Sequence, residues 1–138
     1  MHIGCGACAG PFECYLATRG LKTLALRMER CASNAQGFAE ILKSHPKIDN
    51  VYYPGLKSHP GHKLQKQQSS GFGALVAFEV KGSYKNALKF CSYLKVPTFA
   101  VSLGGVETLL SIPRHLTHKC VPEAQRKVLG KSTLFLSN

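Results

Sequence analysis

The apolar residues in the first third of the chain recur at the spacing of a helix. Within residues 12–43 they follow one another mostly at intervals of three or four positions: Leu16, Leu21, Leu24, Met28, Cys31, Ala35, Phe38, Ala39 and Leu42. Pro11 suits the first turn of a helix, where its missing N–H is not needed, and His45-Pro46 ends the pattern. The sequence therefore predicts one long amphipathic helix, bent near Gly20.

The remainder of the chain alternates short strands with short helices. Apolar, β-branched or aromatic runs predict strands at residues 48–53, 72–80, 98–102 and 106–110. Polar or helix-spaced stretches predict short helices at residues 59–68, 83–94 and 122–129. A long helix followed by this alternation predicts an α+β fold, arranged as an α/β sandwich whose sheet carries helices on one face.

Length and composition are those of a small globular protein. The chain has 138 residues, of which 44% are hydrophobic and 18% charged, which is enough for one compact domain with its own core. No apolar run approaches the ~20 residues that cross a bilayer. The first ten residues lack the basic start and long apolar core of a secretory signal. We therefore expect a cytoplasmic protein with no membrane partner.

The charge of the chain is strongly positive. Eighteen lysines and arginines against seven aspartates and glutamates give a formal charge of +11. Such an excess suits either a polyanionic partner or an unbalanced piece of a larger assembly. The basic residues are scattered, and neither zinc-finger spacing nor an aromatic RNA-binding motif organises them. This distribution predicts no nucleic-acid partner.

Three residue pairs have the spacing of zinc or redox motifs. The pairs are Cys5 with Cys8, His59 with His62, and His115 with His118. No second CxxC accompanies the first, and both histidine pairs stand in proline-containing polar stretches. We interpret the pairs as coincidences and predict no metal site.

The cysteines are expected to be reduced thiols. A disulfide framework is typical of small secreted domains, and this chain shows no secretory segment. Cys14, Cys31 and Cys91 fall within helical patterns, where a small apolar side chain suits a core. We therefore expect these three thiols to be buried.

The SLGG segment, Ser102-Leu103-Gly104-Gly105, is a candidate binding loop. Glycines between two extended segments let backbone N–H groups approach a ligand, and the serine adds a hydroxyl donor. Such a segment is also common as a simple turn, so its local sequence leaves both interpretations open.

Eight stretches of the sequence, taken in order, resemble one family of enzymes. They are PFECYL (11–16), RGLKTL (19–24), RME (27–29), VYYPGL (51–56), SHPGH (58–62), GFG (71–73), AVSLGGVETL (100–109) and LTH (116–118). Together they resemble the C-terminal part of the Cys/Met-metabolism family of pyridoxal-phosphate (PLP) enzymes. This trans-sulfuration family includes cystathionine lyases and synthases, methionine γ-lyase and O-acylhomoserine sulfhydrylases.

The resemblance implies a fold, a domain organisation and a binding site. The fold is the small C-terminal domain of an aspartate-aminotransferase-type (fold type I) enzyme, with residues 1–10 as an irregular leading segment and 11–138 as linker helix plus domain. Ser102 and the Leu103 backbone inherit the binding of the substrate carboxylate. Val101 occupies a specificity position, and its apolar side chain is similar to that of methionine γ-lyase or sulfhydrylase members.

The resemblance also has departures that bear on activity. The family carries its Schiff-base lysine, the acid at the pyridine nitrogen and the phosphate cradle in a large upstream domain, which we expect to be absent from this chain. Residues 129–137 resemble the approach to a family strand that holds a carboxylate-binding arginine, but no arginine occurs there. We therefore predict no catalytic and no cofactor-binding residue in this chain, and no stable binding of PLP by the chain alone.

Two interpretations of function follow. In the first, the chain is a fragment or truncated member of a trans-sulfuration enzyme that acts on sulfur amino acids, inactive by itself. In the second, it is a non-catalytic interaction module that assembles with full-length family subunits or with itself. An apolar face left without its usual partner would favour the second.

Overall fold

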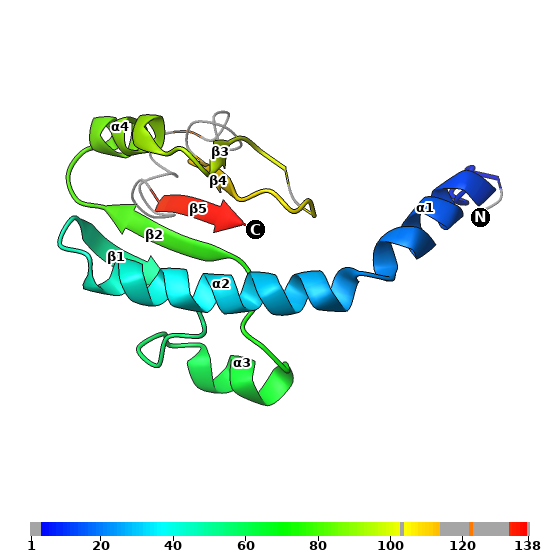
Figure 1. Cartoon of the computed structure of the whole chain (residues 1–138), viewed down its shortest axis with the longest axis horizontal. Helices are drawn as coiled ribbons and strands as arrows, with labels where there is room; N and C mark the ends of the chain where they lie inside the picture. Colours follow the sequence, from blue (N-terminus) through cyan, green and yellow to red (C-terminus); the bar gives the residue numbers. More distant parts are fainter. Residues whose placement is uncertain (1–3, 103, 114–121, 123–132, 138) are drawn as a thin grey trace.

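In the computed structural model of the protein, the described residues are 4–102, 104–113, 122 and 133–137. Along the chain the elements are α1 (Pro11–Leu21), α2 (Leu24–Ser44), β1 (Ile48–Tyr52), α3 (His62–Gln68), β2 (Val76–Val80), α4 (Tyr84–Tyr93), β3 (Thr98–Phe99), β4 (Leu109–Ser111) and β5 (Thr133–Ser137). Figure 1 shows α2 lying along the sheet, α4 near one end of the sheet, and α1 extending away from both.

One mixed five-stranded sheet organises the molecule. Its strand order is β1-β2-β5-β4-β3, and every neighbouring pair is antiparallel except β3 with β4. The last strand in the chain is the middle strand of the sheet, since Leu136 lies opposite Val76 of β2 and Leu110 of β4. The C-terminal residues therefore join the two halves of the sheet.

Helices α2 and α4 cover the same face of this sheet. The Phe78 ring of β2 is fully buried and meets the rings of Phe38 from α2 and Phe90 from α4. Both contacts are edge-to-face, with ring centroids 6.0 Å and 5.9 Å apart, which is a favourable aromatic geometry. This arrangement agrees with the predicted α/β sandwich that carries helices on one face.

The described part of the hydrophobic core lies between the sheet and the two helices α2 and α4. Its fully buried large side chains are Tyr53, Phe78, Leu110, Ile112 and Val76. The Tyr53 hydroxyl donates a hydrogen bond to the Gly73 carbonyl at 2.9 Å, so the buried phenol has a partner. Burial raises the pKa of Tyr53 above its ordinary value.

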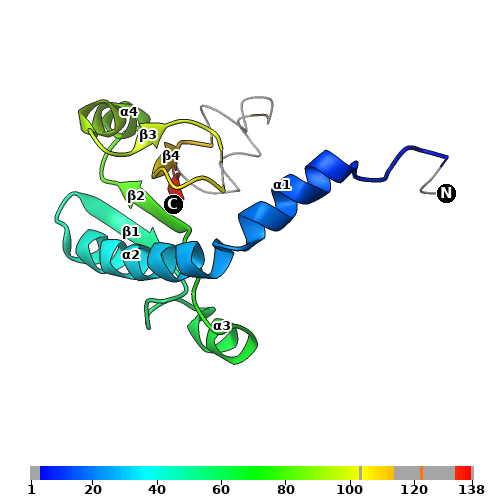
Figure 2. The same ribbon diagram turned by 45° about the vertical axis from the view of Figure 1, so that its right-hand side comes forward.

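The long N-terminal helix, predicted to bend near Gly20, is interrupted close to that position: one helix ends at Leu21 and a new one begins at Leu24. At the break, the Gly20 carbonyl accepts hydrogen bonds from the Thr23 hydroxyl at 3.5 Å and from Arg27 Nη2 at 3.1 Å. Side-chain donors thus stabilise a carbonyl at the end of α1, and glycine in a helix interior weakens the helix. Figure 2 shows that α1 points away from the sheet.

Several predicted strands are shorter or shifted. The strand predicted at 72–80 begins only at Val76, because Gly73 has a positive φ of 78° that departs from the extended conformation. The segment at 98–102 is a strand only at Thr98–Phe99, and the one at 106–110 lies at Leu109–Ser111. The helix predicted at 122–129 lies outside the described residues, apart from position 122.

The helices predicted at 59–68 and 83–94 are present with shorter bounds. α3 begins at His62, because the preceding residues form a turn in which the Gly61 N–H donates to His59 Nδ1 at 3.1 Å. α4 begins after Ser83, which forms a capping box with Asn86, as expected for a serine at that position.

The expectation that three helical cysteines are buried holds only in part. Cys31 and Cys91 are half-buried, and burial raises the pKa of the Cys91 thiol. Cys14 is exposed, so its prediction is wrong. The physical reason is that α1 has no described element packed over the face that carries Cys14.

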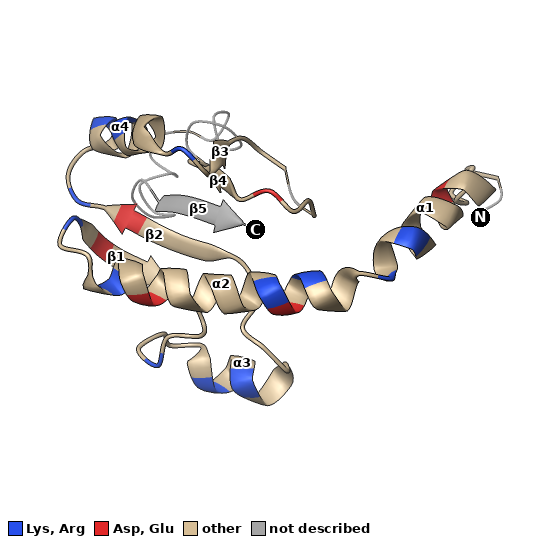
Figure 3. Ribbon diagram, viewed as in Figure 1, with Lys and Arg blue, Asp and Glu red and all other residues tan. Residues whose placement is uncertain are grey.

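Basic residues are spread over all four helices, as Figure 3 shows. Across the described part of the chain, no helix is both long and apolar enough to span a bilayer.

Candidate functional site

A cavity of about 550 Å³ adjoins the SLGG segment. Its walls come from the first turns of α2, from the segment before β2, and from the stretch between β3 and the end of β4. Most of the lining is apolar, and the residues that matter for its chemistry are Arg27, Met28, Leu75, Val101, Ser102 and Ser111. The cavity therefore offers two hydroxyls and one guanidinium in an apolar setting.

The parallel pairing of β3 with β4 holds the SLGG segment beside this cavity. The Thr98 N–H donates to the Thr108 carbonyl at 2.9 Å, and the Ala100 N–H donates to the Leu110 carbonyl at 3.1 Å. The chain leaves the sheet after β3 and returns to it at β4. Gly104 has a φ of 85°, a left-handed conformation that favours glycine, so the sequence Gly-Gly permits the sharp return.

The structure brings two of the three predicted site residues to the cavity. Val101 and Ser102 both line it, and the Val101 side chain is 58% exposed. Leu103 lies outside the described residues, although its neighbours Ser102 and Gly104 are on the cavity wall. The roles of Ser102 and Leu103 in carboxylate binding and of Val101 in specificity remain predictions.

Arg27 is a residue of this site that the sequence analysis did not single out. Its Nη1 donates to the Gly104 carbonyl at 3.4 Å, its Nη2 to the Gly20 carbonyl at 3.1 Å and its Nε to the Thr23 hydroxyl at 3.3 Å. The only sequence signal was its place in one of the family-like stretches. The contact with Gly104 joins residues 77 positions apart, which no local pattern reveals.

The residues that line the cavity do not fit PLP by themselves. The cofactor requires a lysine for its Schiff base and an acid facing the pyridine nitrogen. On the described wall there is neither a lysine nor a carboxylate, and Arg27 is its one charged side chain. Serine hydroxyls and backbone N–H groups suit a small anion such as a carboxylate instead.

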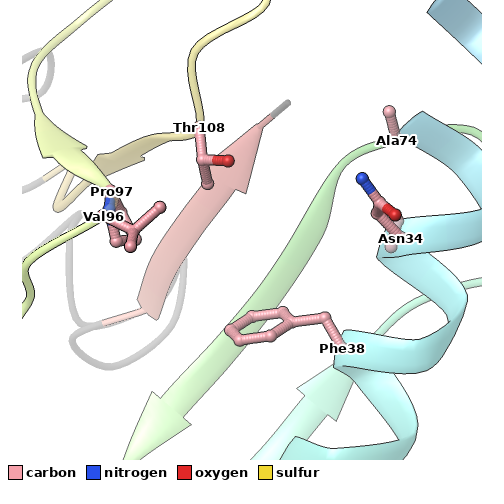
Figure 4. A pocket seen from close by; sticks show the side chains of 7 residues that line it. Asn34, Phe38, Ala74, Val96, Pro97 and Thr108 are labelled. Atoms are coloured by element: carbon pink, nitrogen blue, oxygen red, sulfur yellow. The ribbon is translucent and has the colours of Figure 1, made fainter. Parts of the chain in front are cut away.

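A second cavity, of about 260 Å³, adjoins a later stretch of α2 (Figure 4). Phe38 and Asn34 of α2 form one wall, and Val96, Pro97 and Thr108 form the opposite one. Ala74, which lies just before β2, lines both cavities. The helical spacing of α2 thus supplies a wall to both.

Two of the suspected metal-ligand residues serve local structure. His59 Nδ1 accepts the Gly61 N–H, while His62 Nδ1 lies 2.7 Å from the Pro54 carbonyl and its ring stacks on Phe72. In the ranges that the structure describes, no three His, Cys, Asp or Glu side chains come together in a way that suits a metal ion. The pair at positions 115 and 118 lies outside those ranges.

A polar cluster lies on the other face of the sheet. Glu79 is almost completely buried there and accepts a hydrogen bond from Asn50 Nδ2 at 2.8 Å. Partial burial and the neighbouring Glu79 carboxylate, which is also a hydrogen-bond partner, raise the pKa of Tyr52. These contacts join β1 to β2 and explain how a carboxylate is accommodated in the sheet.

Comparison with known proteins identifies the family of this chain. The sequence matches the family described as "Cys/Met metabolism PLP-dependent enzyme" over residues 1–136. The chain belongs to this family, whose members depend on PLP. The resemblance inferred from the ordered sequence stretches is thereby confirmed at the level of the family.

Individual relatives carry out several reactions. Cystathionine gamma-lyase of Sus scrofa is 47% identical over 125 residues, which cover 91% of this chain and 31% of that protein. L-methionine gamma-lyase of Fusobacterium nucleatum subsp. polymorphum is 44% identical over 125 residues, which cover 91% and 32%.

Solved structures of similar proteins have a region with the same fold as this chain. Cystathionine gamma synthase from Xanthomonas oryzae pv. oryzae, in complex with aminoacrylate and cysteine, has a TM-score of 0.89 at 38% identity and covers 97% of this chain and 35% of its own. Cystathionine gamma-lyase from Lactobacillus plantarum, complexed with L-serine, has a TM-score of 0.88 at 38% identity. This chain spans about a third of the length of the relatives that it matches.

Proposed function

We propose that this chain is the C-terminal, carboxylate-binding part of a trans-sulfuration enzyme that acts on sulfur amino acids. In this function the Ser102 hydroxyl and the backbone N–H groups at Ser102 and Leu103 hold the substrate carboxylate. PLP is held by parts of the enzyme that the chain does not supply. The observation that carries the proposal is the position of Ser102 on the wall of a largely apolar cavity.

The chemistry of the cavity supports this role. A carboxylate needs several donors in a partly dehydrated site, and hydrogen bonds to a charged group are stronger than those between neutral groups. Ser102 and Ser111 bring two hydroxyls to the wall, while Met28 and Leu75 contribute apolar surface to it. An apolar wall beside a polar end suits an amino acid with a thioether side chain.

Val101 is proposed to select among substrates. Its side chain precedes Ser102 directly and lines the same cavity. A valine provides an apolar contact and no acceptor for an ammonium group. We therefore propose a preference for substrates whose side chain ends in an apolar group over those that carry a second amino group.

The carboxylate role is tested by titrating amino acids into the ¹⁵N-labelled chain. We expect L-methionine to shift the Ser102 amide resonance and L-methioninol, which lacks the carboxylate, to leave it unchanged. The Ser102→Ala variant should bind L-methionine about 10-fold more weakly, since one hydrogen bond to a charged group is lost. An equal response to both compounds contradicts the proposed site.

Catalysis by this chain alone is expected to be absent. The family's rate enhancement needs a bound cofactor and a fixed substrate, and such elements act as a unit. We expect no release of thiol and 2-oxo acid from cystathionine, cysteine or methionine above the rate with free PLP. A saturable rate that Ser102→Ala abolishes, or a PLP absorbance band that borohydride fixes to a lysine, would overturn this expectation.

A second candidate function is that of an interaction module. The specific observation in its favour is an apolar stripe on α1 and the start of α2, where Leu16, Leu21, Leu24 and Met28 are exposed. An exposed stripe of this kind suits association with a full-length family subunit or with a second copy of the chain.

Size-exclusion chromatography and pull-down with a full-length relative test this alternative. We expect Leu16→Lys combined with Leu21→Lys to abolish any association, because lysines would have to lose water at the contact. The matched control is Ile41→Lys, which changes an exposed residue farther along α2. A monomer that ignores the full-length relative excludes the module function.

A further inference from the structure

Arg27 joins two parts of the molecule that are distant in sequence. Two of its hydrogen bonds, to the Gly20 carbonyl and the Thr23 hydroxyl, lie within the junction between α1 and α2. The third reaches the Gly104 carbonyl in the SLGG segment. All three guanidinium nitrogens are thereby engaged, and the side chain is half-buried at the cavity wall.

The described residues of the SLGG segment are anchored to the sheet only through the strands on either side, β3 and β4. Val101, Ser102 and Val106 are exposed, so this stretch contributes no side chain to the described core. Two adjacent glycines give it the greatest backbone freedom, and ordering such a stretch costs conformational entropy. Arg27 donates a hydrogen bond to the backbone of this stretch, at the Gly104 carbonyl.

We infer that Arg27 is the positioning residue of the SLGG segment. By donating to the Gly104 carbonyl it fixes the segment against α2, and this contact keeps Ser102 at the cavity wall. Three of the five N–H groups of Arg27 are directed at protein oxygens, so the role inferred for Arg27 is to act through the segment. The importance of this role for substrate binding rests on the proposed function. The contact between Arg27 and the Gly104 carbonyl does not depend on that function.

The shape of the arginine side chain matters for this role. A planar guanidinium donates in several fixed directions at once, which lets one side chain reach Gly20, Thr23 and Gly104 together. A lysine ammonium at the same position keeps the charge but presents a single nitrogen. Lysine is therefore expected to restore the positioning only in part.

Backbone dynamics of the ¹⁵N-labelled full chain test the inference. We expect Arg27→Gln to lower the order parameters of Gly104 and Gly105 from about 0.85, typical of rigid backbone, to below about 0.6. Arg27→Lys should give intermediate values. The matched control is Arg30→Gln, which removes an exposed arginine one helical turn later and should leave both glycines unchanged.

The Thr23→Val variant distinguishes the proposed positioning role of Arg27 from a structural role confined to the junction between α1 and α2. This variant removes the hydroxyl bonds of the junction and leaves the bond from Arg27 to Gly104 in place. We expect it to change amides near Thr23 and not those of Gly104 and Gly105. Slow hydrogen exchange at the Phe78 amide serves to show that each variant keeps the folded sheet.

Unchanged order at Gly104 and Gly105 in Arg27→Gln overturns the inference. If that variant does not fold, Arg27→Lys decides: reduced order supports the inference, and order equal to the original chain overturns it. The L-methionine titration of the original chain is independent of these outcomes. A rigid SLGG segment that depends on Arg27 but shows no response to L-methionine contradicts the proposed function while leaving the positioning role intact.

Discussion

The apolar residues of the two N-terminal helices differ in burial between the first and the second half of this region. In the second half of α2, Ala35 and Ala39 are buried against the sheet at 3% and 0% exposure. In α1 and the start of α2, the same periodicity leaves Leu21 63% and Met28 42% exposed. Both halves carry apolar side chains at helical spacing, and the larger ones are exposed, so the sequence pattern alone does not predict which half is buried.

The difference comes from what lies opposite each half. The sheet and the Phe78 ring face the second half of α2, whereas α1 points away from the sheet (Figures 1 and 2). An amphipathic pattern shows that a helix can bury a face, and it does not say which surface covers that face.

Removing the central ring of the buried region should cost the most. Phe78→Ala deletes the contacts with Phe38 and Phe90 and leaves a cavity, so we expect the free energy of unfolding to fall by about 3–5 kcal/mol. Urea denaturation measures this change. Leu16→Ala on α1 is the matched control and should change stability by less than about 0.5 kcal/mol. Equal losses would contradict the division into a packed and an exposed half.

The buried phenol should contribute a smaller amount. Tyr53→Phe removes the hydroxyl that donates to the Gly73 carbonyl and leaves that carbonyl without this donor. We expect a loss of about 1–2 kcal/mol in urea denaturation. Tyr15→Phe, on the exposed surface of α1, should have no measurable effect. A neutral Tyr53→Phe would show that water replaces the bond without cost.

Ionisation of Tyr53 at alkaline pH should also change the stability of the chain. Because burial raises the folded-state pKa of Tyr53, the folded chain holds this proton more tightly than the unfolded chain. The resulting stability is present below pH ~10, the unfolded pKa, and is lost as the pH rises through the folded pKa. We expect a loss of at most about 1.4 kcal/mol per pH unit in that window.

Unfolding experiments at pH 9 and pH 11 measure this loss. Tyr53→Phe should lose less stability between the two pH values than the original chain, whereas Tyr15→Phe should behave like the original chain. Identical pH profiles for all three proteins would rule out a coupling between folding and ionisation of Tyr53.

The smallest global effect is expected in α1. Gly20 has open space where a Cβ would lie, so Gly20→Ala should stabilise the local helix by up to about 1 kcal/mol. Helix content measured by circular dichroism should rise, while the urea midpoint of the sheet stays the same, since no buried residue belongs to α1. An increase in the urea midpoint would show that α1 unfolds together with the sheet.

Local sequence patterns located most of the secondary structure. Ser83 marked the start of α4, Pro113 prevented extension of β4, and the aromatic and β-branched run after Ile48 formed β1. Patterns failed where long-range contacts decide. The break between α1 and α2 places a side-chain donor from Arg27 on the Gly20 carbonyl, and this same guanidinium is engaged with a loop far along the chain.

The candidate site divides in the same manner. Ser102 and Val101 could be chosen from the sequence, because glycines beside a serine form a recognisable loop and the surrounding stretch resembles a family motif. Arg27 could not be chosen in this way, because an arginine that contacts a distant loop and an arginine that faces solvent look the same in the local sequence of an amphipathic helix. Arg30, three residues later, illustrates this point because it is exposed.

Local spacing and ordered motifs were enough to predict the alternation of helices and strands up to β4 and the family, although they did not predict β5 as a strand. Tertiary structure decided that the last strand, β5, lies between β2 and β4, and which half of the apolar stripe is buried. It also decided that Arg27 and Ser102 share one cavity. The physical reason is that strand pairing and side-chain contacts join residues far apart in the chain, and their free energy depends on surfaces that no local window contains.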